Sequence, residues 1–188
     1  PELPAHVPET ALVIDTGSTK KAIMAAAART SIRHFVGGHP MAGGTSLSEA
    51  RADLFDGRTW FLVNGRQPDA MKRASKFVEA LGAVPVAFAD NGEEHDRLMA
   101  ALSHLPQVTA SLLMAAVARA VGAGNLQFAG NGLRDTTRLA GSSAVMWQSI
   151  LSSNREHLAP LLKHLASELA ALADRLDDPG AEIGRAHV

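Results

Sequence analysis

Residues 35–44 read Phe-Val-Gly-Gly-His-Pro-Met-Ala-Gly-Gly, an apolar run that ends in two glycines, a histidine and a proline. This pattern predicts a buried strand that opens into a tight loop, because glycine permits close backbone approach and proline stiffens the exit. Histidine exchanges protons near neutral pH, so His39 is a candidate general base at the mouth of a sheet. The alternative, a loop histidine with no chemistry, is favoured by residue type alone.

The segment before this stretch predicts a strand, a glycine turn and a helix. Residues 11–15 are a short apolar run that ends in Asp15, and an alanine-rich segment occupies 21–29. Two apolar strands joined by a crossover helix form a parallel unit of an α/β layer. We expect Ser18 or Thr19 to cap the helix, and residue type favours this structural role for Ser18 over nucleophilic chemistry. Because ligands lie beyond the carboxyl ends of such strands, Ser18 and His39 are expected to be neighbours.

The rest of the chain changes from mixed to purely helical periodicity. The patterns predict strands at 59–63 and 84–89, and helices at 68–81, 93–121, 134–139, 143–153 and 155–176. Pro106 is the expected kink of the long helix. The predicted fold class is therefore α/β followed by all-α: a partial Rossmann-like parallel sheet at 1–91 and a helical domain at 92–188.

Composition limits the classes of function. The 188 residues carry a formal net charge of −1, which gives no reason to expect a nucleic-acid partner, and they contain no cysteine. No apolar run approaches the roughly 20 residues that span a bilayer, so no membrane partner is expected. The beginning of the chain lacks the pattern of a signal peptide, and a cytoplasmic protein is expected.

Two further histidines and one arginine are candidate functional residues. His95 and His104 should lie on opposite sides of a straight helix, and neither belongs to an i,i+4 histidine pair, so no metal site is expected. Hydrogen bonding between the two halves is their expected role; a metal-dependent hydrolase is the alternative. The Arg138 guanidinium could bind a carboxylate, although residue type favours a solvated surface position.

Several motifs occur together in a recognisable order. They are Asp-Thr-Gly-Ser-Thr-Lys at 15–20, Gly-Gly-His-Pro-Met-Ala-Gly at 37–43, Ala-Asp-Leu-Phe at 52–55, His-Asp at 95–96, Ser-His-Leu-Pro at 103–106, and Arg-Asp-Thr-Thr-Arg at 134–138 with Trp147. Together they resemble the prephenate/arogenate dehydrogenase family of tyrosine biosynthesis. The resemblance covers about residues 11–155. It reverses the preference for the structural interpretations of His39 and Arg138.

The resemblance implies a Rossmann domain followed by a helical dimerisation domain. It also implies NAD(P)-dependent oxidative decarboxylation of prephenate or arogenate by a homodimer. The implied catalytic residues are His39 and Ser18; the implied substrate-binding residues are Arg138, Gln107, His104 and Trp147; the implied contacts to NAD or NADP are Gly17, Ser18 and Pro40. Gln107 stands where the family often has a second histidine.

A second and larger departure from the family pattern concerns the glycine-rich loop. No Gly-x-Gly-x-x-Gly follows a strand in these residues, and such a loop normally holds the dinucleotide pyrophosphate. We therefore expect a fragment of a longer enzyme that, alone, neither binds NAD with useful affinity nor turns over. The alternative function is a non-catalytic helical dimerisation or interaction module.

Overall fold

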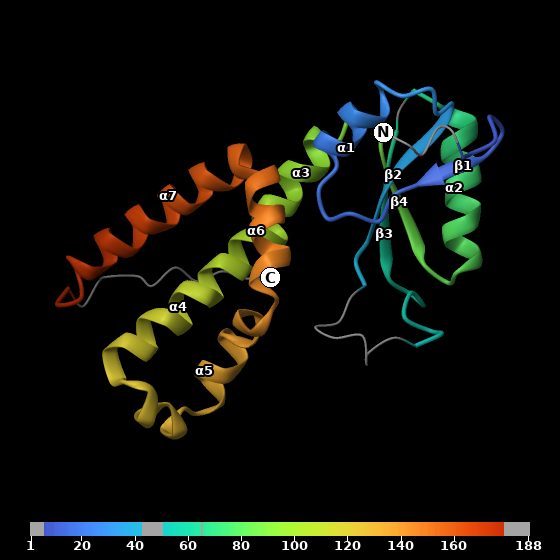
Figure 1. Ribbon diagram of the computed structural model, residues 1–188. Helices are drawn as coiled ribbons and strands as arrows, with labels where there is room; N and C mark the ends of the chain where they lie inside the picture. The colour runs from blue at the N-terminus through green and yellow to red at the C-terminus, as the bar shows by residue number, and fades with distance from the viewer. Residues whose placement is uncertain (1–5, 43–50, 65, 179–188) are drawn as a thin grey trace.

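The computed structural model describes residues 6–42, 51–64 and 66–178. It has two parts: a sheet with helices α1 (Lys21–Ala27) and α2 (Pro68–Ala80), and a region built from helices alone (Figure 1). The predicted fold class, α/β followed by all-α, is confirmed. Gly43, the last residue of the 37–43 motif, lies outside the described part of the chain.

The sheet has four strands in the order β1 (Leu12–Ile14), β2 (His34–Pro40), β3 (Thr59–Val63) and β4 (Val84–Phe88). β1 pairs with β2 in parallel, as predicted for strands joined by a crossover helix. β3 and β4, which are joined by α2, are also parallel. The prediction of a parallel sheet fails at the centre, because β2 and β3 are antiparallel. Strands of opposite direction need no crossover helix between them.

The apolar core lies between the sheet and α2. Pro68 stands in the first turn of this helix, where the missing N–H costs no hydrogen bond. The helix buries Ala70, Ala74 and Val78 against Val36, Trp60, Leu62 and Ala83. Successive side chains of a strand point to opposite faces, so the odd-numbered residues of β2, among them His39, face the side of the sheet away from α2. The core therefore leaves that second face to α1 and the polar groups described below.

The helical part begins with one long element. It consists of α3 (Glu93–Met99), a π-helical segment η3 (Ala100–His104) and α4 (Leu105–Val121). The segments that follow are η4 (Ala123–Phe128), α5 (Asn131–Thr136), η5 (Arg138–Gly141), α6 (Ala144–Ser153) and α7 (Arg155–Ala173). The helix predicted at 134–139 is thus divided between α5 and η5.

The π-helical segment explains why one expectation was wrong. Pro106 has no N–H to continue the α-helical ladder, and the widened turn directly precedes it. A widened turn contains more residues, so His104 does not lie opposite His95 as in a straight helix. Both rings are buried, and both belong to one polar network.

The long helix is strongly apolar although no uninterrupted apolar run spans it. By length and composition, Glu93–Val121 is able to cross a membrane; an 18-residue window has a mean hydropathy of 1.3. Core helices of soluble proteins pass the same test. Only 22% of this window is buried within the single chain, so much of its apolar surface is exposed.

Candidate active site

His39 lies near the carboxyl end of β2 and is only 9% exposed. Its Nδ1 is 2.9 Å from Nε2 of His95, and the Phe61 ring lies 6.1 Å away between centroids. Burial, followed by the charges of His95 and Lys20, lowers the pKa of His39 to about 3. The imidazole is therefore neutral at pH 7, which is the form that can accept a proton.

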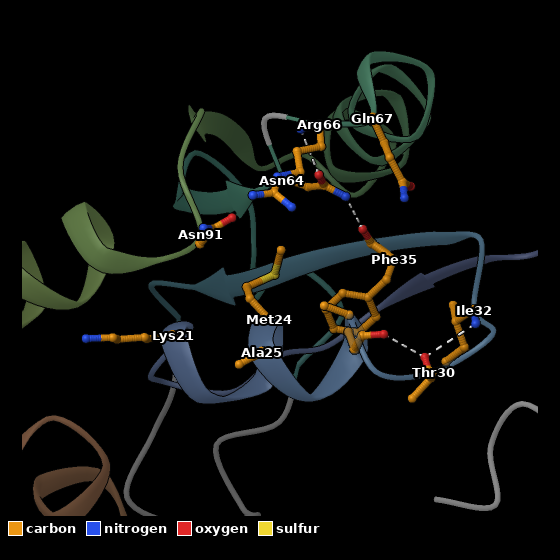
Figure 2. Close-up of a pocket in the computed structure, with 12 residues that line it drawn as sticks. Lys21, Met24, Ala25, Thr30, Ile32, Phe35, Asn64, Arg66, Gln67 and Asn91 are labelled. Atoms are coloured by element: carbon orange, nitrogen blue, oxygen red, sulfur yellow. Dashed lines mark hydrogen bonds between the residues drawn. The ribbon is translucent and has the colours of Figure 1, made fainter.

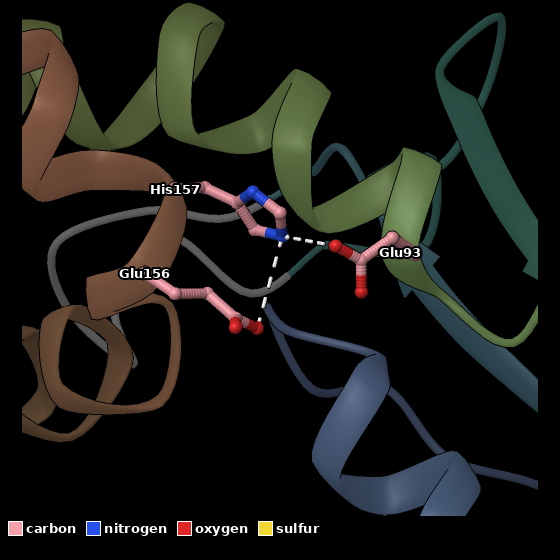
Figure 3. Close-up of side chains that lie close together, drawn as sticks. All are labelled: Glu93, Glu156 and His157. Carbon is pink, nitrogen blue, oxygen red and sulfur yellow. Dashed lines mark ion pairs between the residues drawn. The ribbon is translucent and has the colours of Figure 1, made fainter.

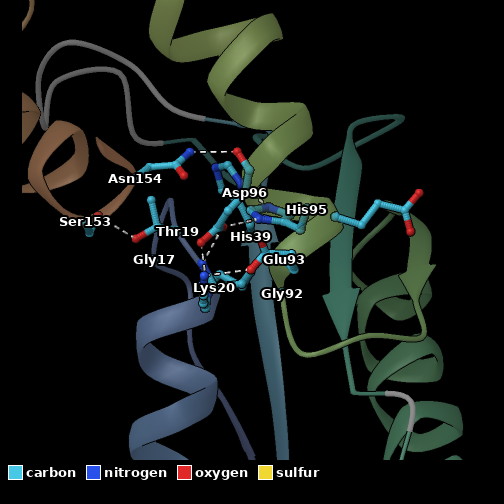
Figure 4. A network of polar contacts seen from close by, with 12 residues as sticks. Gly17, Thr19, Lys20, His39, Gly92, Glu93, His95, Asp96, Ser153 and Asn154 are labelled. Atoms are coloured by element: carbon cyan, nitrogen blue, oxygen red, sulfur yellow. Dashed lines mark hydrogen bonds and ion pairs between the residues drawn. The ribbon is translucent and has the colours of Figure 1, made fainter. Parts of the chain in front are cut away.

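His95 and Asp96 connect His39 to the helical part (Figure 4). Both side chains are almost completely buried, and His95 Nδ1 is 2.8 Å from Asp96 Oδ1. The His95 ring also packs edge-on against Phe61 and Phe88. The expectation of a hydrogen bond between the halves is confirmed for His95, whereas His104 bonds to Asn154 within the helical part. No site role was predicted for His95 or Asp96.

Asp96 also caps a helix of the sheet part. Its carboxylate accepts hydrogen bonds from the backbone N–H groups of Lys20 at 2.7 Å and Lys21 at 2.9 Å. The prediction that Ser18 or Thr19 caps α1 is wrong, because the N-cap position is Lys20 and no local side chain bonds there. Thr19 instead exchanges a hydrogen bond with Ser153 of α6.

A buried ion pair holds the peptide in front of His39. Lys20 Nζ donates to Asp15 Oδ2 at 2.5 Å and to the Gly38 carbonyl at 2.6 Å, while Gly38 N–H donates to Asp15 Oδ1 at 2.9 Å. Glycine is required at position 38, since an added Cβ would lie 2.4 Å from the Asp15 carbonyl oxygen. Burial outweighs the attraction of Asp15 and lowers the pKa of Lys20. Both backbone polar groups of Gly38, its N–H and its carbonyl, are thereby held by side chains.

His104 joins the same network from the other end of the π-helical segment. Asn154 Nδ2 donates to the Asp96 carbonyl at 2.7 Å and lies 3.1 Å from His104 Nδ1. The Trp147 ring meets His104 edge-on at 5.8 Å. Burial lowers the pKa of His104 to about 4, so this ring too is neutral at pH 7. The structure thus links three of the predicted residues, His39, His104 and Trp147.

Gln107 and Arg138 lie further along the helical part. Gln107 is buried on α4, and its Nε2 donates to the Leu139 carbonyl at 2.8 Å. This bond holds η5, the segment on which Arg138 is exposed to solvent. Within the part of the chain that the structure describes, Arg138 has no place in the His39 network.

The predicted cofactor contacts lie at the carboxyl ends of the parallel pair. Gly17 and half-buried Ser18 form the turn after β1, and Pro40 ends β2. The turn and β2 are tied together because Asp15 accepts from both Gly17 N–H and Gly38 N–H. Open α/β sheets bind their ligands beyond the carboxyl ends of their strands, so the position suits a nucleotide.

Two other features lie apart from His39. Glu93, Glu156 and His157 converge as a metal site would (Figure 3), but the Lys21 ammonium already pairs with both carboxylates. A groove of about 490 Å³ runs beside α1 (Figure 2) and is lined by Met24, Phe35 and Asn64 among others. The expectation that the protein uses no metal stays a prediction.

The fold and the site define a class of two-part proteins, in which an α/β sheet domain precedes a region built from helices. Residues 1–87 match the family description "Prephenate dehydrogenase, nucleotide-binding domain", and residues 91–182 match "Prephenate dehydrogenase, dimerization domain". The chain belongs to the prephenate dehydrogenase family, and the resemblance seen in the sequence is confirmed.

Individual relatives agree with the family match. The chain is 37% identical over 146 residues to "Probable prephenate dehydrogenase NovF" of Streptomyces niveus, covering 75% of this chain and 40% of that protein. It is 30% identical over 179 residues to the prephenate dehydrogenase of Bacillus subtilis, covering 91% and 48%. Prephenate dehydrogenase from Aquifex aeolicus, in complex with hydroxyphenyl propionate and NAD+, superimposes with a TM-score of 0.83 at 26% identity, covering 96% and 65%. The chain spans about half the length of these two curated relatives.

Proposed function

We propose that the protein carries out the NAD(P)-dependent oxidative decarboxylation of prephenate to 4-hydroxyphenylpyruvate, or of arogenate to tyrosine. The observation that carries this proposal is the buried, neutral His39 at the carboxyl end of β2, hydrogen-bonded to the helical part. The names of the relatives and the NAD+ in the Aquifex aeolicus complex support it. NAD or NADP, when bound, supplies the hydride acceptor.

The chain's own residues supply the proton chemistry and the positioning. His39 accepts the proton of the ring hydroxyl while the carbon that bears this hydroxyl gives its hydride to the nicotinamide acceptor. The bond between the ring and its carboxylate then breaks, its electrons enter the ring, and the ketone oxygen takes back the proton from His39 as the phenol forms. Carbon dioxide leaves and the ring becomes aromatic. Ser18 hydrogen-bonds the hydroxyl or orients His39, and its half-buried position in the turn after β1 is compatible with this role.

Recognition of the substrate's carboxylates is assigned to the helical part. Arg138 is the cation for one carboxylate, because its guanidinium matches that group with two parallel hydrogen bonds. Gln107 holds the segment of Arg138 through its bond to the Leu139 carbonyl, and we assign the adjacent rings of His104 and Trp147 to the substrate side of the site. Since Arg138 is exposed in the single chain, we place it in the site of the same subunit or of a second copy.

We also propose a cytoplasmic homodimer formed through residues 92–188, with 1–91 as the nucleotide-binding domain. The dimerization description of the matched family model supports the pairing. Large apolar side chains of the helical part are exposed, among them Leu102, Leu112, Phe128 and Val145. A second copy would cover this surface at a gain proportional to the apolar area buried. Sedimentation equilibrium is expected to give twice the mass of one chain.

Turnover of the complete gene product tests the proposed activity. One NAD(P)H and one carbon dioxide should form for each prephenate or arogenate consumed. Reduction of the cofactor without release of carbon dioxide would contradict decarboxylation. Absence of turnover with both acids and both cofactors would favour the alternative, a non-catalytic dimerisation module.

A further inference from the structure

We propose that His95 and Asp96 are positioning residues that hold His39 in the tautomer with its proton on Nδ1, leaving Nε2 to accept the substrate proton. This inference rests on the proposed function for its catalytic consequence. The tautomer itself is a property of the folded chain and can be measured without turnover. Three buried groups in a line carry it: His39, His95 and Asp96 (Figure 4).

Asp96 is at one end of this row, and its ionised carboxylate can only accept hydrogen bonds. The backbone N–H groups of Lys20 and Lys21 donate to the Asp96 carboxylate, and Nδ1 of His95 lies 2.8 Å from it. Burial acts to raise the pKa of Asp96, but these hydrogen bonds outweigh it and the pKa lies below its usual value. An ionised carboxylate has no proton to donate, so His95 carries its proton on Nδ1.

The proton on His95 Nδ1 determines which of the other ring nitrogens of His95 and His39 carry a proton. In the proposed tautomer the single ring proton of His95 is on Nδ1, which makes Nε2 an acceptor. His39 Nδ1 lies 2.9 Å from that nitrogen and must be the donor. Its Nε2 is then the nitrogen with a free lone pair. The opposite tautomer of His95 would place a lone pair 2.8 Å from the carboxylate oxygen, with no proton between them.

The arrangement also stabilises the product of proton transfer. The ionisable groups that act on His39 are Lys20, His95, Asp96 and His104, and among these Asp96 alone favours the charged imidazolium. The His95 ring lies between the Asp96 carboxylate and His39 and is within hydrogen-bond distance of both. Asp96 belongs to α3 and caps α1, so docking of the helical part on the sheet and orientation of the base depend on one carboxylate.

Nitrogen-15 NMR of the histidine rings in this chain is the direct test. At pH 7 the wild-type protein is expected to show a protonated Nδ1 and an unprotonated Nε2 on His39. His95→Phe keeps a ring beside Phe61 and Phe88 but removes the acceptor, and it should convert His39 to a mixture of both tautomers. His95→Gln offers an amide oxygen in place of Nε2 and should restore the wild-type pattern in part.

Kinetics of the complete gene product add the catalytic readout. His95→Phe should lower kcat by about 10- to 100-fold, as loss of an orienting hydrogen bond does elsewhere, with KM little changed and partial rescue by His95→Gln. A protonated Nε2 on wild-type His39 would overturn the proposal, whichever variants fold. So would a folded His95→Phe protein with unchanged His39 signals. If wild-type His39 carries its proton on Nδ1 but His39→Asn loses no activity, the proposed function is contradicted and the tautomer assignment stands.

Discussion

Asp96 accepts a hydrogen bond from the backbone N–H of Lys20 at 2.7 Å, so a side chain of the helical part caps a helix of the sheet part. The same carboxylate accepts from Lys21 N–H and from His95. A cap normally comes from the residue that precedes the helix. Here the cap comes from another part of the fold, and helix α1, the ion pair at Lys20 and the base at His39 therefore depend on contact between the two parts.

Replacement of the capping carboxylate should destabilise the whole chain. Asp96→Ala removes the cap of α1 and leaves His95 without its acceptor, and each loss costs about 1–2 kcal/mol. The free energy of unfolding measured with urea is expected to fall by about 2–4 kcal/mol. Glu94→Ala removes an exposed carboxylate from the same helix and serves as the control. Equal effects of the two variants would show that Asp96 has no special role.

The buried pair of Lys20 and Asp15 offers a second stability test. Lys20→Met leaves the Asp15 carboxylate without its cation and the Gly38 carbonyl without its donor, and breaking such a buried pair costs roughly 3 kcal/mol. Lys21→Met is the matched control, because its ion pairs are exposed to solvent and such pairs contribute little to stability. A double-mutant cycle with Asp15→Asn should give a coupling of about 0.5–3 kcal/mol. Simple additivity would refute the coupling of the two residues.

Most strands and helices could be predicted because short stretches of the sequence determine them. Apolar runs located all four strands, and Pro68 marked the start of α2. The cap at Asp96 could not be predicted, because it joins residues more than seventy positions apart and resembles no local motif. The same holds for the antiparallel pairing of β2 and β3, which depends on how the chain reverses rather than on either strand.

The candidate site was predicted less completely than the fold. His39 could be identified because glycines and a proline surround it, and those residues have few other uses at a strand end. Lys20 and Asp15 gave no comparable signal, since charged residues are mostly exposed. Their presence in the 15–20 motif was the available hint. The position of His104 depended on the π-helical segment before Pro106, which helical periodicity does not reveal.

The buried histidines predict how stability depends on pH. An unfolded histidine binds a proton near pH 6.5, whereas folded His39 and His104 do so only near pH 3 and 4. Between these values the unfolded chain binds more protons, so the free energy of unfolding should fall as pH drops from about 6.5 toward 4. Urea midpoints across this range measure the slope.

Two histidine variants separate this effect from general acid sensitivity. His39→Gln should reduce the slope of stability against pH, because one buried neutral ring is lost. His164→Gln, at an exposed position of α7, should leave the slope unchanged. A wild-type slope of zero between pH 6.5 and 4.5 would contradict the burial of neutral rings.

Substrate binding tests the role of Arg138. In the complete gene product, Arg138→Ala should raise KM for prephenate or arogenate by an amount equivalent to about 2–5 kcal/mol, with a smaller effect on kcat, because a charged hydrogen-bonded pair is lost. Arg134→Ala removes a neighbouring exposed guanidinium and should change KM little. An unchanged KM in Arg138→Ala would assign the carboxylate to another cation.

The central claim is that His39 is the general base, and its most direct test is the turnover of His39→Asn in the complete gene product. Asparagine cannot take up the hydroxyl proton, so kcat is expected to fall by roughly 10²–10⁴ while NAD or NADP binding is retained. His164→Asn, at an exposed histidine, should retain wild-type turnover. A His39→Asn protein that turns over within a few-fold of wild type would contradict the account.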